Sequence, residues 1–459
     1  MSKRFGQFLK LPKKMGHGIL GTFRQFRYAE RNILIFVVYG LLFDVFMNLH
    51  RPFNVKFLTR VGGGEFHIAL LNSLPGIVAV FAIIPGSLLI NRFASKRGII
   101  SGFFIAARLF VLALVFVPIL PLHMQPLMFV LLFSFMNFPD AISQTGLQSY
   151  LGEVFDGVSR SRAITLRNKF GQIVAPVIAI ITGLIITLLP RGTAEEQNAQ
   201  AILIYQIFFG LAFVIACAEI FVFRKLRERK TSDDVQVISS VAAVQKTSTK
   251  ESLRAIPGVL KDKRFVGYMI PTLFFFFMFQ SGWPLFGILQ VIVLEATELH
   301  MATNAALAGL SGFIGAGVWT RIMRRKGNDF TCFLCAMGLA VGMIMTAFAP
   351  TIEVYIVMQI VAGFSGVGVV ITLLNGLLTF TPDKNRVIYI SVYNTFVSIS
   401  LAISPFFAHA LQNRFGVREA MFIVGVGRIF AAFALLAIYF KTREKKTVRR
   451  NVPKRFKRL

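Results

Sequence analysis

Residues 84–98 read IPGSLLINRFASKRG, an apolar run that ends in a polar, basic stretch and a glycine. The same design returns at residues 313–327, which read FIGAGVWTRIMRRKG. Two glycines and two basic positions align at one offset of 229 residues, which is the difference between positions 86 and 315: Gly86 with Gly315, Arg92 with Arg321, Arg97 with Lys326, and Gly98 with Gly327. We therefore interpret the chain as two copies of one unit.

The composition is that of a membrane protein. Of 459 residues, 55% are hydrophobic and 15% are charged, with a mean hydropathy of +0.67, which is too apolar for a soluble domain of this size. Apolar runs of about 20 residues, long enough to cross a bilayer as helices, recur about twelve times. A β-barrel would alternate apolar and polar residues, and runs such as TLFFFFMF at 272–279 do not. The predicted spans are 33–50, 66–90, 98–120, 126–149, 164–189, 201–223, 265–293, 302–320, 330–349, 352–379, 387–411 and 420–440.

The basic residues predict the orientation of these helices. The formal net charge is +29, and the Lys and Arg residues gather in the two termini and in alternate loops. Such a bias is typical of cytoplasmic segments, so we expect both termini to lie in the cytoplasm of a multi-pass cell-membrane protein, bacterial in origin. Because insertion accounts for the basic residues, nucleic-acid binding is excluded as an interpretation.

The spans and polar segments divide the chain into five parts. We expect a basic amphipathic segment at 1–32, a six-helix bundle at 33–223, a cytoplasmic linker at 224–264, a second six-helix bundle at 265–440, and a basic tail at 441–459. Six plus six helices with both termini on one side give two halves of parallel topology, related by an axis along the membrane normal. The fold class is therefore an all-α membrane protein of 12 helices in two pseudo-symmetric bundles.

At this point the chain resembles the major facilitator superfamily of secondary transporters, over essentially everything after residue 30. The loop after the second span keeps the basic half of the family's loop motif in Arg92 and the Lys96–Arg97 pair, but Asn91 stands where the family has Asp. The fifth span carries a reduced form of the pattern typical of drug and metabolite antiporters, in Gly171, Ala175, Pro176 and Ala179.

The resemblance implies rocking of the two halves around a central cavity, with these loops controlling closure at the cytoplasmic end. The residues expected to form these gate loops are Asn91, Arg92, Lys96, Arg97, Arg321, Arg325 and Lys326. The alternative is that the basic residues only determine topology.

Three charged residues lie deep in the predicted spans. Asp44 is twelve residues beyond Asn32, about 18 Å along a helix, and Arg108 and Asp140 lie at similar depth. A charge at this depth is costly, so we expect the three to form one cluster in which two acids share one base. Protonation of Asp44 or Asp140 would then be coupled to substrate binding. The alternative is a static ion pair that fixes helix packing.

Polar residues at helical spacing from these acids, together with a few in the second half, are candidates for the substrate cavity. They are Asn48, Asn137, Gln144, Gln280, Trp283 and Asn375. The alternative for each is a hydrogen bond between helices. We expect Gly282 and Pro284 to break the seventh helix, Arg428 to bind backbone carbonyls, and Glu219 to reach the membrane interface without a special role.

The sequence thus predicts a proton-coupled secondary transporter of a small molecule, leaning to efflux, and a functional monomer within the lipid bilayer. Proton-linked uptake of a metabolite and a non-transporting sensor or scaffold with the same fold remain alternatives. We find no nucleotide-binding pattern, cofactor site, metal site or paired catalytic groups, so an enzyme is not expected.

Overall fold

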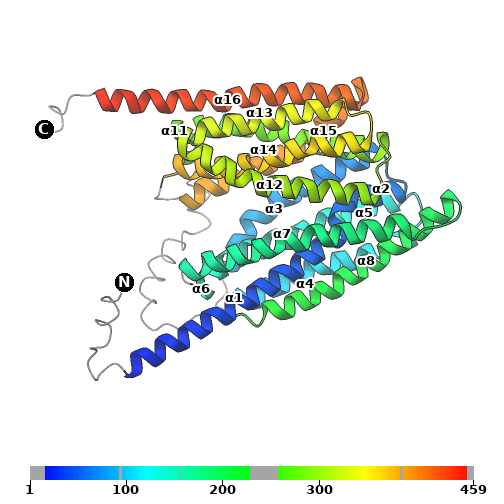
Figure 1. Ribbon diagram of the computed structural model, residues 1–459, viewed down its shortest axis with the longest axis horizontal. Helices are drawn as coiled ribbons and strands as arrows, with labels where there is room; N and C mark the ends of the chain where they lie inside the picture. The colour runs from blue at the N-terminus through cyan, green and yellow to red at the C-terminus, as the bar shows by residue number, and fades with distance from the viewer. Residues whose placement is uncertain (1–15, 92–95, 156, 228–256, 383–385, 452–459) are drawn as a thin grey trace, which may run out of the picture.

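The computed structural model describes residues 16–91, 96–155, 157–227, 257–382 and 386–451, and this part of the chain contains helices and no β-strand (Figure 1). The first half comprises α1 (Gly16–His50), η1 (Arg51–Phe53), α2 (Asn54–Arg60), α3 (Glu65–Asn91), α4 (Lys96–Leu114), η2 (Val117–Ile119), α5 (Gln125–Phe135), α6 (Asn137–Val154), α7 (Gly157–Leu188) and α8 (Ala194–Phe223). The second comprises α11 (Lys263–Ile288), η3 (Leu289–Val293), α12 (Glu298–Lys326), α13 (Asn328–Ala347), α14 (Ile352–Phe380), α15 (Arg386–Phe415) and α16 (Val417–Asn451).

Twelve segments of the described residues are long and apolar enough to cross a membrane, and each coincides with one predicted span. The first span continues through η1 into α2, and the fourth consists of α5 and α6 in series. The prediction of an all-α protein with twelve membrane-crossing helices is therefore confirmed.

The two halves repeat one packing pattern. In the first half α1 packs against α7 and α8, while α4 packs against α6 and α8. In the second half α11 packs against α15 and α16 in the same way, and α13 against α14 and α16. The internal duplication visible in the sequence is therefore a duplication of the six-helix bundle.

The halves meet along two helix pairs, α3 with α15 and α7 with α12. Glycine permits both close approaches, because a Cβ at Gly76 would lie 2.7 Å from the backbone nitrogen of Ala402. At Gly183 it would lie 2.8 Å from the carbonyl oxygen of Glu298. Small residues at such crossings let apolar helices pack closely without a hydrophobic driving force.

The two ends of the bundle differ. The start of α1 and the end of α16 lie at the same end, which we call the near end, and the bundles diverge toward it (Figure 1). At the opposite end, the far end, the halves converge. If the predicted orientation holds, the near end is cytoplasmic.

Several predicted boundaries differ from the structure. The helix α1 passes without interruption through the predicted boundary at residue 32, and α16 continues beyond 440 to Asn451. The helix α11 also continues through Gly282 and Pro284, and the irregular turn is the π-helix η3 that follows it. The prediction of a break at Pro284 was wrong. Residues 1–15, most of the linker (228–256) and 452–459 lie outside the described residues.

Candidate functional site

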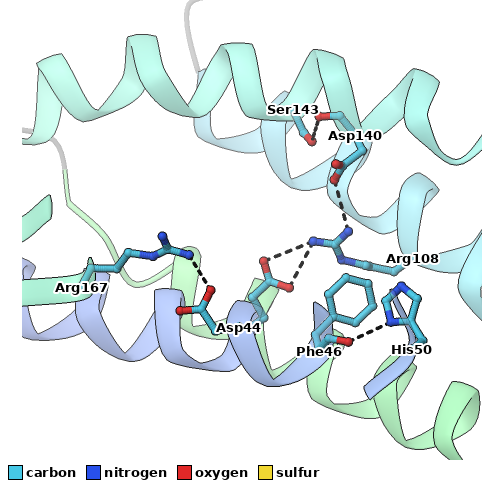
Figure 2. Close-up of polar contacts among 8 residues, drawn as sticks. Asp44, Phe46, His50, Arg108, Asp140, Ser143 and Arg167 are labelled. Carbon is cyan, nitrogen blue, oxygen red and sulfur yellow. Dashed lines mark hydrogen bonds and ion pairs between the residues drawn. The ribbon is translucent and has the colours of Figure 1, made fainter. Parts of the chain in front are cut away.

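Arg108 of α4 is a deeply buried cation of the first half, only 1% exposed. Its Nη1 lies 3.3 Å from Asp140 Oδ1, and its Nη2 lies 3.3 Å from Glu219 Oε2. The guanidinium also stacks on the ring of Phe46, 4.1 Å from the centroid (Figure 2). One cation is therefore shared by two carboxylates, from α6 and α8.

Pro139 positions Asp140. A proline in a helix removes one hydrogen bond and clashes with the preceding turn, and here the helix is interrupted between α5 and α6, at Met136. Asp140 consequently lies in the first turn of α6, where the helix dipole favours a negative charge. The predicted contact between Arg108 and Asp140 is thus present in the structure.

Asp44 forms a separate ion pair. Its Oδ1 accepts a hydrogen bond of 2.8 Å from Nη2 of Arg167, which joins α1 to α7 (Figure 2). The expectation that Asp44 joins the Arg108 cluster was wrong. Phe46 of α1 faces Arg108, and Asp44 lies two positions before it, which is about 200° around the helix axis, so its side chain points elsewhere.

Two glycines make room for this second pair. A Cβ at Gly171 would overlap the Asp44 carboxylate, and one at Gly40 would overlap the Arg167 side chain. Gly171, the glycine of the helix-five pattern, is therefore required by the position of the Asp44 carboxylate. The Asp44 and Arg167 side chains are 14% and 27% exposed, so this pair is more accessible than the Arg108 cluster.

Glu219 is the functional candidate that sequence reasoning missed. We expected it at the membrane interface, whereas the structure buries it completely, facing α4. The signal was present in the spacing of Ala212, Ala216, Glu219 and Phe223, which all lie on one buried face of α8. A carboxylate within such an apolar face indicates a partner inside the bundle.

Four of the predicted cavity residues hydrogen-bond to backbone carbonyls or to a sulfur atom. Asn48 donates to the Asp44 carbonyl of its own helix at 2.8 Å, and Asn137 of α6 donates to the Phe133 carbonyl of α5 at 2.9 Å. Gln280 donates to the Val397 carbonyl of α15 at 3.4 Å, and Asn375 of α14 contacts the Met323 sulfur of α12. For these last two, the alternative of contacts between helices fits the structure.

The remaining two candidates differ in exposure. Gln144 of α6 is half-buried. Trp283 of α11 is 41% exposed and packs edge-on against Phe279, so it is available to a solute or to lipid.

The predicted gate residues lie at the near end. Arg97 donates to the carbonyls of Arg224 and Leu226, at 3.2 and 3.1 Å, and so caps the end of α8 within its own half. Lys96 begins α4, and Asn91 ends α3. Exposed residues at the end of α12 are Arg321, Arg325 and Lys326. Arg92 lies outside the described residues.

Arg428 of α16 is buried and binds backbone, as predicted. Its guanidinium donates to the carbonyls of Met278 and Phe279, at 3.1 and 2.7 Å, and lies near that of Leu339 at 3.5 Å. A Cβ at Gly282 would overlap the guanidinium, so this glycine of α11 accommodates Arg428.

Residues 34–405 match the family model described as Major Facilitator Superfamily. The chain belongs to the Major Facilitator Superfamily. The resemblance inferred from the loop motif and topology is thereby confirmed, and the protein is a multi-pass membrane protein. No curated protein matches it by sequence.

Solved structures of this superfamily share the fold. A mutant of the nucleoside transporter NupG is 13% identical with a TM-score of 0.64, over 89% of this chain and 100% of that one. A bacterial homologue of the human lysosomal transporter Spinster, inward-facing and unoccupied, is 13% identical with a TM-score of 0.65, over 90% and 97%. A D-xylose–proton symporter is 16% identical with a TM-score of 0.60, over 88% and 96%.

Proposed function

We propose that this protein is a secondary transporter that moves a small solute by alternating access and couples the movement to a proton. The observation that carries the proposal is the sharing of Arg108 between Asp140 and Glu219 in a buried site. Family membership and the two-bundle fold support transport in general.

The charge balance of the site favours a proton. In the buried cluster, Arg108 alone faces two acids, Asp140 and Glu219, while Asp44 and Arg167 pair one to one and Arg51, which also interacts with Asp140, is exposed. With Arg108, Asp140 and Glu219 all ionised, the buried cluster has one negative charge in excess, and an uncompensated charge in a low-dielectric site is costly. One proton on Asp140 or Glu219 removes that excess, because Arg108 then pairs with the other carboxylate.

The Arg108 cluster and the Asp44–Arg167 pair differ in solvent exposure, so we assign them different roles in transport. Glu219 is sealed, whereas the Asp140 side chain is 12% exposed and offers the proton a route to solvent. The Asp44–Arg167 pair is the more accessible one, so a charged group of the solute would meet it first. Movement of the Asp44–Arg167 pair would act directly on α1 and α7, and α7 packs against the opposite half.

The direction of transport is proposed as efflux. The support is the helix-five pattern around Gly171 and Pro176, which resembles the antiporter branch of the family. Proton-linked uptake is the alternative, favoured by the likeness of the fold to a D-xylose–proton symporter. Either direction requires a transporter and not an enzyme.

The test uses purified protein in vesicles that contain a pH-sensitive dye. Cationic, neutral and anionic compounds are supplied outside in turn, and the internal pH is recorded. We expect one class of compound to move protons, with internal alkalinisation for an antiporter and acidification for a symporter. Glu219→Gln should abolish this signal, while Glu195→Gln, at an exposed position of the same helix, should preserve it.

Two results would contradict the proposal. Solute entry that is independent of pH, and equal in wild type and Glu219→Gln, would indicate a uniporter. No movement of any compound in a well-folded preparation would favour a sensor or scaffold.

A further inference from the structure

A second polar site lies at the far end of the bundle, between the halves. Arg60, the last residue of α2, donates from Nε to Oε1 of Glu298 at 2.6 Å. Glu298 is the first residue of α12, and its side chain is 1% exposed. An ion pair with a buried carboxylate and a partly buried arginine thus joins the two halves, at the opposite end from the predicted gate loops.

Further residues of the first half hold this pair in place. The Tyr205 hydroxyl of α8 donates to the same Glu298 oxygen at 3.2 Å. Arg60 Nη1 donates to Asn198 Oδ1 at 3.1 Å, and Asn198 donates in return to the Arg60 carbonyl at 3.2 Å. The Glu298 carboxylate of the second half therefore accepts hydrogen bonds from α2 and α8, and the Arg60 side chain is itself held by Asn198.

The start of α12 is rigid enough to make this contact specific. Thr297 and His300 cap the helix reciprocally, so the chain at Glu298 has a defined position. The Leu299 backbone N–H donates to Thr187 Oγ1 of α7 at 3.1 Å. Gly183 of α7 packs directly on the Glu298 backbone. The carboxylate also lies at the amino end of α12, where the helix dipole favours it.

We propose that Arg60 and Glu298 form a latch, supported by Tyr205 and Asn198, that holds the far end closed and sets the ratio of the two access states. Opening the far end must separate these residues, because one belongs to each half. The carboxylate then exchanges a short, charge-assisted bond for water. The inference rests on the proposed alternating access, but it assigns the control to a site at the far end.

The near end supplies the contrast. Arg97, in the predicted gate loop, uses its guanidinium on the end of α8 in its own half. Its loss should therefore affect α8 and leave the separation of the halves unchanged.

The test measures the far-end separation in the purified full chain, without solute or gradient. Spin labels are attached at Leu122→Cys in the first half and Phe348→Cys in the second, both exposed at the far end, with exposed Cys217 replaced by Ser. Pulsed electron paramagnetic resonance then gives the populations of short and long distances. In Glu298→Gln we expect the ratio of long to short to rise about tenfold, the size expected for a hydrogen bond to a charged group.

Three variants make the result interpretable. Glu419→Gln makes the same change in the first turn of α16, at an exposed position of the same half, and should leave the distances unchanged. Tyr205→Phe removes one hydrogen bond and should shift them less. Arg60→Glu combined with Glu298→Arg should restore much of the short-distance population, even if a single variant folds poorly.

Wild-type distances in a folded Glu298→Gln protein would overturn the latch, as would an equal shift in Glu419→Gln. Because no solute is present, the outcome is separate from the vesicle test. A shift in distance without proton movement would keep the latch and reject the proton-coupled transport.

Discussion

The two halves share one packing pattern but treat buried charge in different ways. In the first half Arg108 is paired with two carboxylates, a kind of group that can gain or lose a proton. In the second half Arg428 is held by backbone carbonyls, which cannot. A duplicated scaffold has therefore kept its architecture in both copies, while the buried arginine of the first copy has carboxylate partners and that of the second has backbone partners. We infer that proton chemistry belongs to the first half and that Arg428 fixes helix packing in the second.

The largest expected effect is that of Arg108→Gln. The substitution leaves two buried carboxylates without a cation, and removal of one partner of a buried ion pair costs about 3–5 kcal/mol. We expect a large fall in melting temperature, measured by the fluorescence of the purified protein. The double variant with Glu219→Gln should be more stable than the single variant. A double variant as unstable as the single variant would contradict the inference that Arg108 stabilises the protein by pairing with Glu219.

Arg428→Met should have a smaller effect. It removes the side-chain donors to buried carbonyls, and we expect the free energy of unfolding to fall by about 1–3 kcal/mol. The sharper expectation concerns function, because the carbonyl partners do not titrate. Proton movement by the Arg428→Met variant in vesicles, corrected for the amount of folded protein, should keep the wild-type dependence on pH. A changed pH profile would assign proton chemistry to the second half as well.

Gly171→Ala tests the slot beside Asp44. A Cβ there would displace the carboxylate from Arg167, and overpacking of this kind costs about 1–3 kcal/mol. The matched control is Gly210→Ala in α8, where a Cβ meets nothing within 4 Å and alanine favours the helix. We expect a lower melting temperature for the first variant and an equal or higher one for the second. Equal stability of both would argue against a built site for the pair.

Arg97→Gln should have the smallest effect. It removes a half-exposed cap from the end of α8, worth about 0.5–1.5 kcal/mol for such hydrogen bonds. The far-end distances between the two spin labels should stay as in the wild type. A clear shift in those distances would restore the near-end loop to a gating role.

Sequence patterns predicted the framework well. Hydropathy located all twelve spans because a bilayer requires long apolar helices, and the offset of 229 residues revealed the duplication. Depth along the helix identified Arg108 and Asp140, which meet in the structure.

Rotation of the helices could not be predicted in the same way. In a membrane both lipid and protein core are apolar, so hydropathy does not say which face of α1 looks inward, and Asp44 was assigned to the wrong partner. Glu219 was missed because its distance from Arg224 suggested an interfacial residue. The Arg60–Glu298 contact joins positions 238 apart in sequence, at the ends of helices, where no periodic pattern exists.

We propose that Arg108, Asp140 and Glu219 together hold one exchangeable proton. The most direct measurement is the infrared band of a protonated carboxyl group in the purified protein, followed across a pH titration. We expect a titrating band that is lost in Glu219→Gln or Asp140→Asn and kept in Asp44→Asn. A band that survives both of the first two substitutions, or that disappears only in Asp44→Asn, would contradict it.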